Sequence, residues 1–62
     1  MDVLIKDICN NSIILNNVVS IDYNVPMNRV FFSNGETCIY DILISNIKII
    51  SLKNETYRKS KM

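Results

Sequence analysis

The 62-residue sequence has no histidine and no tryptophan, one glycine, one proline and two cysteines. Without histidine it lacks the side chain that most often acts as a general base near neutral pH. One glycine cannot make a glycine-rich phosphate-binding loop. Two cysteines without a histidine leave no third soft ligand for a zinc site. The composition therefore predicts a protein that is not an enzyme and binds no cofactor or metal.

The two cysteines, Cys9 and Cys38, could in principle form a disulfide, but no signal-peptide pattern indicates an oxidising compartment. We therefore expect two half-buried free thiols, because free cysteine prefers the protein interior. No apolar run reaches the ~18 residues that a membrane-spanning helix requires. The sequence predicts a cytoplasmic protein with no membrane association.

Branched aliphatic residues dominate the apolar composition, with eleven isoleucines and five valines. Such side chains suit a pleated sheet better than a helix, so the composition predicts β-structure. Nine asparagines are expected to fill the connections. The joint excess of isoleucine, asparagine and lysine is typical of AT-rich genomes and indicates a low-GC bacterium, a phage or a mobile element as the source.

Charge is unevenly distributed along the chain. Residues 1–47 hold two basic and five acidic side chains, a net charge of −3, whereas residues 48–62 hold five basic and one acidic side chain, a net charge of +4. Residues 53–62 have no periodic apolar pattern. We expect a single β domain over residues 1–52 and a basic C-terminal extension over residues 53–62.

Alternating apolar and polar residues predict short strands joined by polar turns. Strands are expected at residues 1–9, 12–15, 18–23 and 47–52, with a hairpin across residues 28–41. In the strand at residues 18–23, Val19, Ile21 and Tyr23 are expected to point inward. Pro26 ends this strand and favours a turn, because it fixes φ and has no N–H.

Two segments stay open at this level. Residues 16–17, Asn-Asn, form either a second tight turn or a bend in one long strand. Residues 41–46 form either a short helical turn capped by Asp41 or more strand.

Five or six short strands predict an all-β protein, either a small antiparallel barrel or a strongly bent sheet. The order of hairpin, short turn and final strand is similar to the layout of SH3-like barrels. The likeness is one of layout only, because the aromatic ligand-binding residues of SH3 domains are missing, and no family is assigned.

The hairpin at residues 28–41 has the strongest local signal, because Asn34-Gly35 lies between two β-rich runs. A two-residue type I′ loop is expected, since asparagine tolerates a positive φ and glycine adopts it freely. A three-residue loop with a bulge is the alternative, and it would re-sort the two faces of the hairpin.

The two-residue loop would pair Phe31 with Cys38 and Arg29 with Tyr40, and would place all four side chains on one face. The opposite face would carry Val30, Phe32, Thr37 and Ile39. Both faces are largely apolar, so the hairpin is either covered on both sides or has one face against a partner.

These features predict a small non-catalytic protein-interaction module, such as an inhibitor or an adaptor. A domain of this size buries only about 60% of its unfolded surface, so self-association is also expected. The candidate residues for binding a protein partner are Arg29, Phe31, Cys38 and Tyr40.

Single-stranded nucleic-acid binding is the alternative function. Small β-barrels bind single strands by stacking bases on aromatic side chains beside a basic groove. The candidate residues are Tyr57, Arg58, Lys59 and Lys61 in the basic extension.

Overall fold

Between residues 1 and 52 the secondary structure consists of β-strands and two short 3₁₀ turns. The computed structural model describes residues 1–52, and the expected extension at residues 53–62 lies outside the described residues. The strands are β1 (Val3–Asp7), β2 (Ser12–Leu15), β3 (Ser20–Asn24), β4 (Arg29–Ser33), β5 (Cys38–Leu43) and β6 (Ile47–Leu52); the 3₁₀ turns are η1 (Val25–Met27) and η2 (Ile44–Asn46). The all-β prediction and the predicted final strand at residues 47–52 are confirmed.

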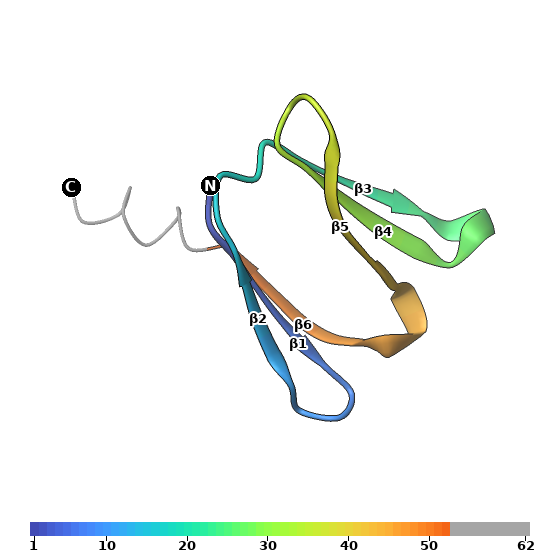
Figure 1. Ribbon diagram of the computed structural model, residues 1–62. Coiled ribbons are helices and arrows are strands. Elements are labelled where there is room, and N and C mark those ends of the chain that lie inside the picture. The colour runs from blue at the N-terminus through green and yellow to red at the C-terminus, as the bar shows by residue number, and fades with distance from the viewer. Residues whose placement is uncertain (53–62) are drawn as a thin grey trace, which may run out of the picture.

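The strands form two three-stranded antiparallel sheets with the orders β2-β1-β6 and β3-β4-β5. The sheets face each other, and residues 16–19 carry the chain from the first sheet to the second (Figure 1). Within the described chain the sheets do not join into a closed barrel, so the barrel form of the prediction is not observed. The order of hairpin, short turn and final strand is as expected.

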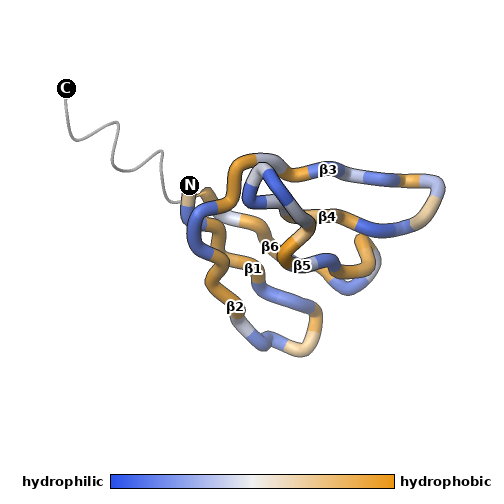
Figure 2. Tube along the Cα trace, turned by 45° about the horizontal axis from the view of Figure 1, so that its top comes forward, coloured by the Kyte–Doolittle hydropathy of each residue, from blue (hydrophilic) through white to orange (hydrophobic). Residues whose placement is uncertain are grey.

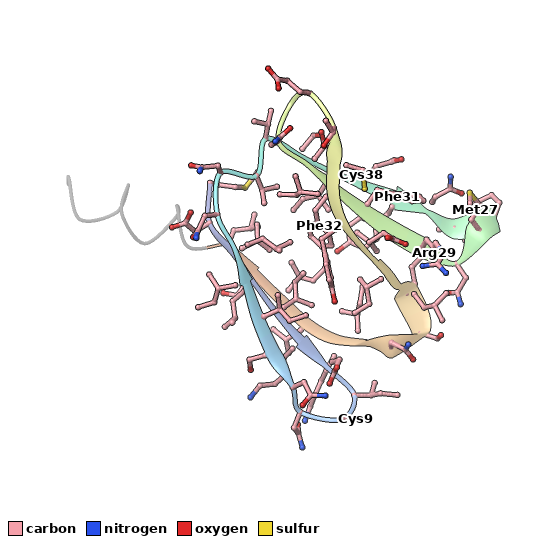
Figure 3. All side chains as sticks on the ribbon, viewed as in Figure 1. Cys9, Met27, Arg29, Phe31, Phe32 and Cys38 are labelled. Carbon is pink, nitrogen blue, oxygen red and sulfur yellow. The ribbon has the colours of Figure 1, made fainter. Side chains whose placement is uncertain are left out.

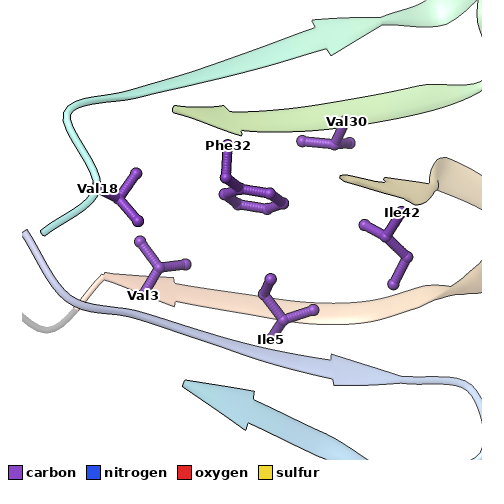
Figure 4. Packing of buried hydrophobic residues seen from close by; sticks show 6 residues of the cluster. All are labelled: Val3, Ile5, Val18, Val30, Phe32 and Ile42. Carbon is purple, nitrogen blue, oxygen red and sulfur yellow. The ribbon is translucent and has the colours of Figure 1, made fainter. Parts of the chain in front are cut away.

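Six buried aliphatic and aromatic side chains fill the space between the sheets (Figure 4). They are Val3 and Ile5 of β1, Val30 and Phe32 of β4, Ile42 of β5, and Val18 between β2 and β3. The central strand of each sheet thus contributes two core residues. Figure 2 shows the apolar stretches along β1, β2 and β6 that accompany this core, while β3 is largely hydrophilic.

The connection between β2 and β3 decides between the two interpretations of Asn16-Asn17. Strand pairing stops at Leu15, Asn17 adopts a positive φ of 63°, and β3 begins only at Ser20. The Val18 amide donates to the Met1 carbonyl over 2.8 Å, and the Met1 terminal amine donates to the Val18 carbonyl over the same distance. The chain therefore turns between sheets at this point, and Val18 enters the core.

Inward-facing positions in the next strand differ from the prediction. Val18 is buried, whereas Val19 is 63% exposed, and Tyr23 is also mostly exposed. Of the three residues expected inward, only Ile21 packs against the core. The bend at Asn17 buries Val18 in place of Val19, whereas Ile21 and Tyr23 lie opposite Phe32 and Val30 on the predicted inner face, although Tyr23 stays mostly exposed.

The β4–β5 hairpin exists, but its predicted type I′ loop is wrong. Ser33 pairs with Cys38, which leaves the four residues 34–37 in the loop. Gly35 has a φ of 98°, but Asn34 is not at positive φ, and a type I′ turn requires both. The Asn34 side-chain oxygen instead accepts hydrogen bonds from the amides of Glu36 and Thr37 over 2.9 and 3.0 Å.

An irregularity in β5 then changes which side chains share a face. The pairing shifts between Ser33 and Phe32, so that Phe32 lies opposite Tyr40 and Ile39 is the extra residue of a bulge. The inner face consequently carries Val30, Phe32, Tyr40 and Ile42. The outer face carries Arg29, Phe31 and Asp41.

Residues 41–46 combine both alternatives left open by the sequence. Strand β5 continues to Leu43, and η2 follows directly. Asp41 does not cap η2; the N-cap position is Leu43, which makes no side-chain capping bond. The Ile44 amide donates to the Asn28 carbonyl over 2.9 Å, and this ties η2 to the start of β4.

Candidate functional site

The four residues predicted to bind a partner do not form one surface. Arg29 and Phe31 lie on the outer face of the β3-β4-β5 sheet, and Cys38 is exposed at its loop end beside Ser33 (Figure 3). Tyr40 lies on the inner face, where its ring centroid is 6.2 Å from that of Phe32. The bulge in β5 removes Tyr40 from the predicted set.

The thiols are also placed differently from the expectation. Cys9 and Cys38 are free, and both are exposed rather than half-buried. Cys9 lies in the turn between β1 and β2, whereas Cys38 begins β5 in the other sheet (Figure 3).

Carboxylates surround the aromatic side chain on the outer face. Phe31 lies opposite Asp22 of β3 on one side and opposite Asp41 of β5 on the other. Arg29 makes an ion pair with Asp41, with 2.6 Å between guanidinium nitrogen and carboxylate oxygen. Both partners are about two-fifths exposed, at 39% and 43%, so water screens this pair and it contributes little to stability. Because Asp41 neutralises Arg29, Asp22 leaves the surface around Phe31 net negative.

A negative surface around Phe31 does not suit contact with a phosphate backbone. Tyr57, Arg58, Lys59 and Lys61, the candidates for nucleic-acid binding, lie outside the described residues. Nucleic-acid binding through the extension stays a prediction.

A second surface lies at the end of the β3–β4 hairpin that joins the two strands through η1. Tyr23, Val25 and Met27 are 56%, 73% and 56% exposed, and we call these three side chains the tip. Figure 1 shows η1 at one extremity of the molecule. The sequence predicted a turn at Pro26, with Tyr23 pointing inward from the strand before it, and no exposed apolar surface.

Hydrogen bonds on both sides hold the tip in one backbone conformation. The Asn24 side-chain oxygen accepts from the Met27 amide over 3.2 Å. Asn28 adopts the left-handed conformation with φ 57°, and its amide donates to the Val25 carbonyl over 2.9 Å. Pro26 in the first turn of η1 fixes a further φ angle.

The tip is also anchored to the neighbouring connection. Besides the bond from the Ile44 amide to the Asn28 carbonyl, the Asn28 side-chain amide donates to the Ser45 hydroxyl over 3.3 Å. The loop therefore presents its apolar side chains from a fixed frame. The sequence held a signal for this feature: Val-Pro-Met between two asparagines places large apolar residues in a turn, where polar residues are usual.

Asp7 has a structural role in the turn that joins β1 and β2. Its side chain accepts hydrogen bonds from the amides of Asn11 and Cys9, each over 2.9 Å, and closes the turn between β1 and β2. Hydrogen bonding from the Asn11 amide is the main cause that lowers the pKa of Asp7 below its ordinary value.

Residues 1–52 contain no cavity and no group of three or more acidic or thiol side chains suited to a metal ion. None of their helical segments has the length and apolar character needed to cross a membrane. Comparisons with protein-family models, curated proteins and solved structures found no match.

Proposed function

We propose that the protein is a small non-catalytic interaction module that inserts its tip into an apolar pocket of a partner protein. The observation that supports this is the exposure of Tyr23, Val25 and Met27 on a loop held by hydrogen bonds at both ends. A module of this kind acts as an inhibitor or an adaptor.

The tip has apolar area to contribute on binding. Complete burial of a side chain such as valine or methionine is worth about 1.5–3 kcal/mol, and each tip side chain has more than half of its area still exposed. Burial of the tip would therefore contribute about 3 kcal/mol in total. Because the loop is already ordered, little of this gain is lost to fixing its conformation.

Charge beside the tip indicates what surrounds the pocket. Asn24 pairs with Arg29 at the start of the outer face, so η1 adjoins the outer face, whereas Tyr23 lies opposite Val30 on the other face of the sheet. Beyond that pair, the unneutralised charge next to Phe31 is Asp22. A partner with basic residues around its apolar pocket would complement this surface, and Phe31 would contact the edge of the pocket.

The test compares three immobilised proteins: the wild type, a Val25→Ser/Met27→Ser tip variant and an Ile8→Ser/Ile49→Ser control. The control removes comparable exposed apolar area away from the tip, from the turn after β1 and from β6, where the two isoleucines are 59% and 50% exposed. Quantitative mass spectrometry identifies proteins retained from extracts of the source cell, and calorimetry then measures the affinity of each purified candidate. Circular dichroism confirms that all three proteins fold.

We expect a partner that binds the wild type and the control alike and binds the tip variant at least about tenfold more weakly, equivalent to about 1.4 kcal/mol. Cross-linking from position 27 should map to an apolar pocket with basic neighbours. A partner that binds the tip variant as tightly as the wild type would contradict the proposal.

A further inference from the structure

The four edge strands of the two sheets are not equally protected against pairing with another strand. β3, β5 and β6 each carry a charged side chain, Asp22, Asp41 and Lys48 respectively, and β5 also has a bulge. Charges and bulges are the usual devices that prevent edge-to-edge association. β2 reads Ser-Ile-Ile-Leu and has neither device.

The open edge of β2 presents two residues with unpaired backbone groups. The Asp7 amide donates to the Asn11 carbonyl over 3.0 Å at the start of the β1–β2 ladder. Bonded and non-bonded pairs alternate along an antiparallel ladder, so Ile13 and Leu15 bond to β1. The N–H and C=O groups of Ser12 and Ile14 then point away from β1. Among residues 1–52 no strand pairs with that edge.

We propose that this edge pairs with β2 of a second copy of the chain, antiparallel and about a two-fold axis at Ile13. In this register Ser12 of each copy lies opposite Ile14 of the other, and the free donors and acceptors of both residues meet. The side chains also match, because Ser12 and Ile14 lie on the outer face of the sheet and Ile13 faces inward. The product is a continuous six-stranded sheet.

Because β2 carries no charged side chain, its open edge can pair with β2 of a second copy without repulsion between like charges. A two-fold axis brings each residue near its own counterpart, so the same pairing of β3 would bring Asp22 close to a second Asp22, and pairing of β6 would do the same with Lys48. β2 meets no such repulsion. Ile14, which is 57% exposed and lies opposite Leu4, would lie opposite Ser12 of the second copy and diagonally across from the second Ile14. This contact is independent of the tip, which belongs to the other sheet.

The test uses the full chain made by chemical synthesis, with one backbone amide methylated. N-methylation of Ile14 removes a donor from the open edge and leaves the β1–β2 bonds in place. N-methylation of Ile13 is the matched control: it adds the same methyl group but removes a hydrogen bond to β1, so it should lower the melting temperature. Sedimentation equilibrium from about 1 μM to about 1 mM covers affinities from tight to weak.

We expect a reversible dimer of the wild type and, for N-methyl-Ile14, a dissociation constant raised by about tenfold or more with an unchanged circular dichroism spectrum. Hydrogen exchange of the Ile14 amide should slow as the protein concentration rises. A monomeric wild type over the whole range would overturn the proposal, as would a dimer that N-methyl-Ile14 does not weaken. Protection of the Ile14 amide that does not depend on concentration would also overturn it, since a segment of the same chain would then cover the edge.

Discussion

Phe31 and Phe32 are adjacent in sequence and lie on opposite faces of β4, so they allow a direct test of the strand register. Phe32 is 0% exposed and lies at the centre of the core, whereas Phe31 is half-buried on the outer face between Asp22 and Asp41. A one-residue slip of β4 would exchange the two environments. Replacing each phenylalanine by alanine therefore removes the same atoms from two different surroundings.

The magnitudes separate the two variants clearly. A buried phenylalanine replaced by alanine costs about 3–5 kcal/mol, because the side chain leaves a cavity that its neighbours fill only in part. A chain of this length has a total stability of about 3–9 kcal/mol. Phe32→Ala should therefore lose at least about a third of the total stability, and all of it if the wild type lies at the low end of that range. Phe31→Ala loses only the burial of a partly covered ring and should cost about 1 kcal/mol.

Urea unfolding followed by far-ultraviolet circular dichroism provides the measurement, with Phe32→Leu as a milder variant that should stay folded and lose about 1 kcal/mol. Equal midpoints for the two alanine variants, or a larger loss for Phe31→Ala, would refute the register and the assignment of the inner face. The free energy of unfolding should depend on urea concentration with a similar slope for wild type and Phe31→Ala, which would show that the folded and unfolded states are otherwise unchanged.

Three further changes test the connections. Gly35→Val should lower the free energy of unfolding, measured with urea, by about 1–2 kcal/mol. The loss should come from backbone strain alone, because a Cβ added at Gly35 would lie 3.6 Å from Val19, an ordinary contact distance. An unchanged urea midpoint would contradict this. Asn17→Ala should lower the free energy of unfolding by about 1 kcal/mol, because residue 17 has a positive φ. Asn17→Gly and the neighbouring Asn16→Ala should change it little. Equal effects of the two alanine substitutions would count against the bend at Asn17. Because the pKa of Asp7 is lowered in the folded protein, its ionised side chain adds stability at pH values above the ordinary pKa of 3.8, and this stability is lost as the pH falls below that value. The melting temperature of Asp7→Asn should therefore fall less steeply in acid than that of the wild type. Parallel curves of melting temperature against pH would show that Asp7 does not contribute.

The sequence was most informative about where the strands lie. A strand was expected within residues 1–9, and β1 lies at Val3–Asp7 with Val3 and Ile5 in the core. The final strand at residues 47–52 has the predicted bounds. Only the bounds of the final strand follow from the sequence, because Lys48 is the extra residue of a bulge opposite Lys6 and Asp7, so that Ile47 and Ile50 both pack against the core.

Prediction failed where one residue breaks the alternation. The bend at Asn17 buries Val18 in place of Val19, and the extra residue Ile39 moves Tyr40 to the inner face. Bulges and crossings between sheets depend on contacts with distant strands and leave no local mark in an Asn-rich chain. The pairs assigned to the hairpin were wrong for the same reason, although the hairpin itself was correct.

The candidate site shows the same limit. Arg29 and Phe31 were expected at an interface and lie on the outer face, but the acidic surroundings of Phe31 depend on its pairing with Asp22 and Asp41. The sequence did not predict the tip, because Pro26 by itself explains a turn at this position. The apolar character of Val25 and Met27 was visible in the sequence, and only the structure shows that both are exposed.

In this chain asparagine occupies turn positions with positive φ, which in other proteins are often occupied by glycine. Asn10, Asn17 and Asn28 adopt positive φ angles, and the side chains of Asn24 and Asn34 accept hydrogen bonds that close their loops. Asparagine tolerates the left-handed region but has far less backbone freedom than glycine, so its loops lose less entropy on folding. A chain this small has few core contacts with which to order a flexible loop. The asparagines on either side of the tip thus explain how three large apolar side chains stay exposed in one arrangement, and that ordered exposure is what a binding surface requires.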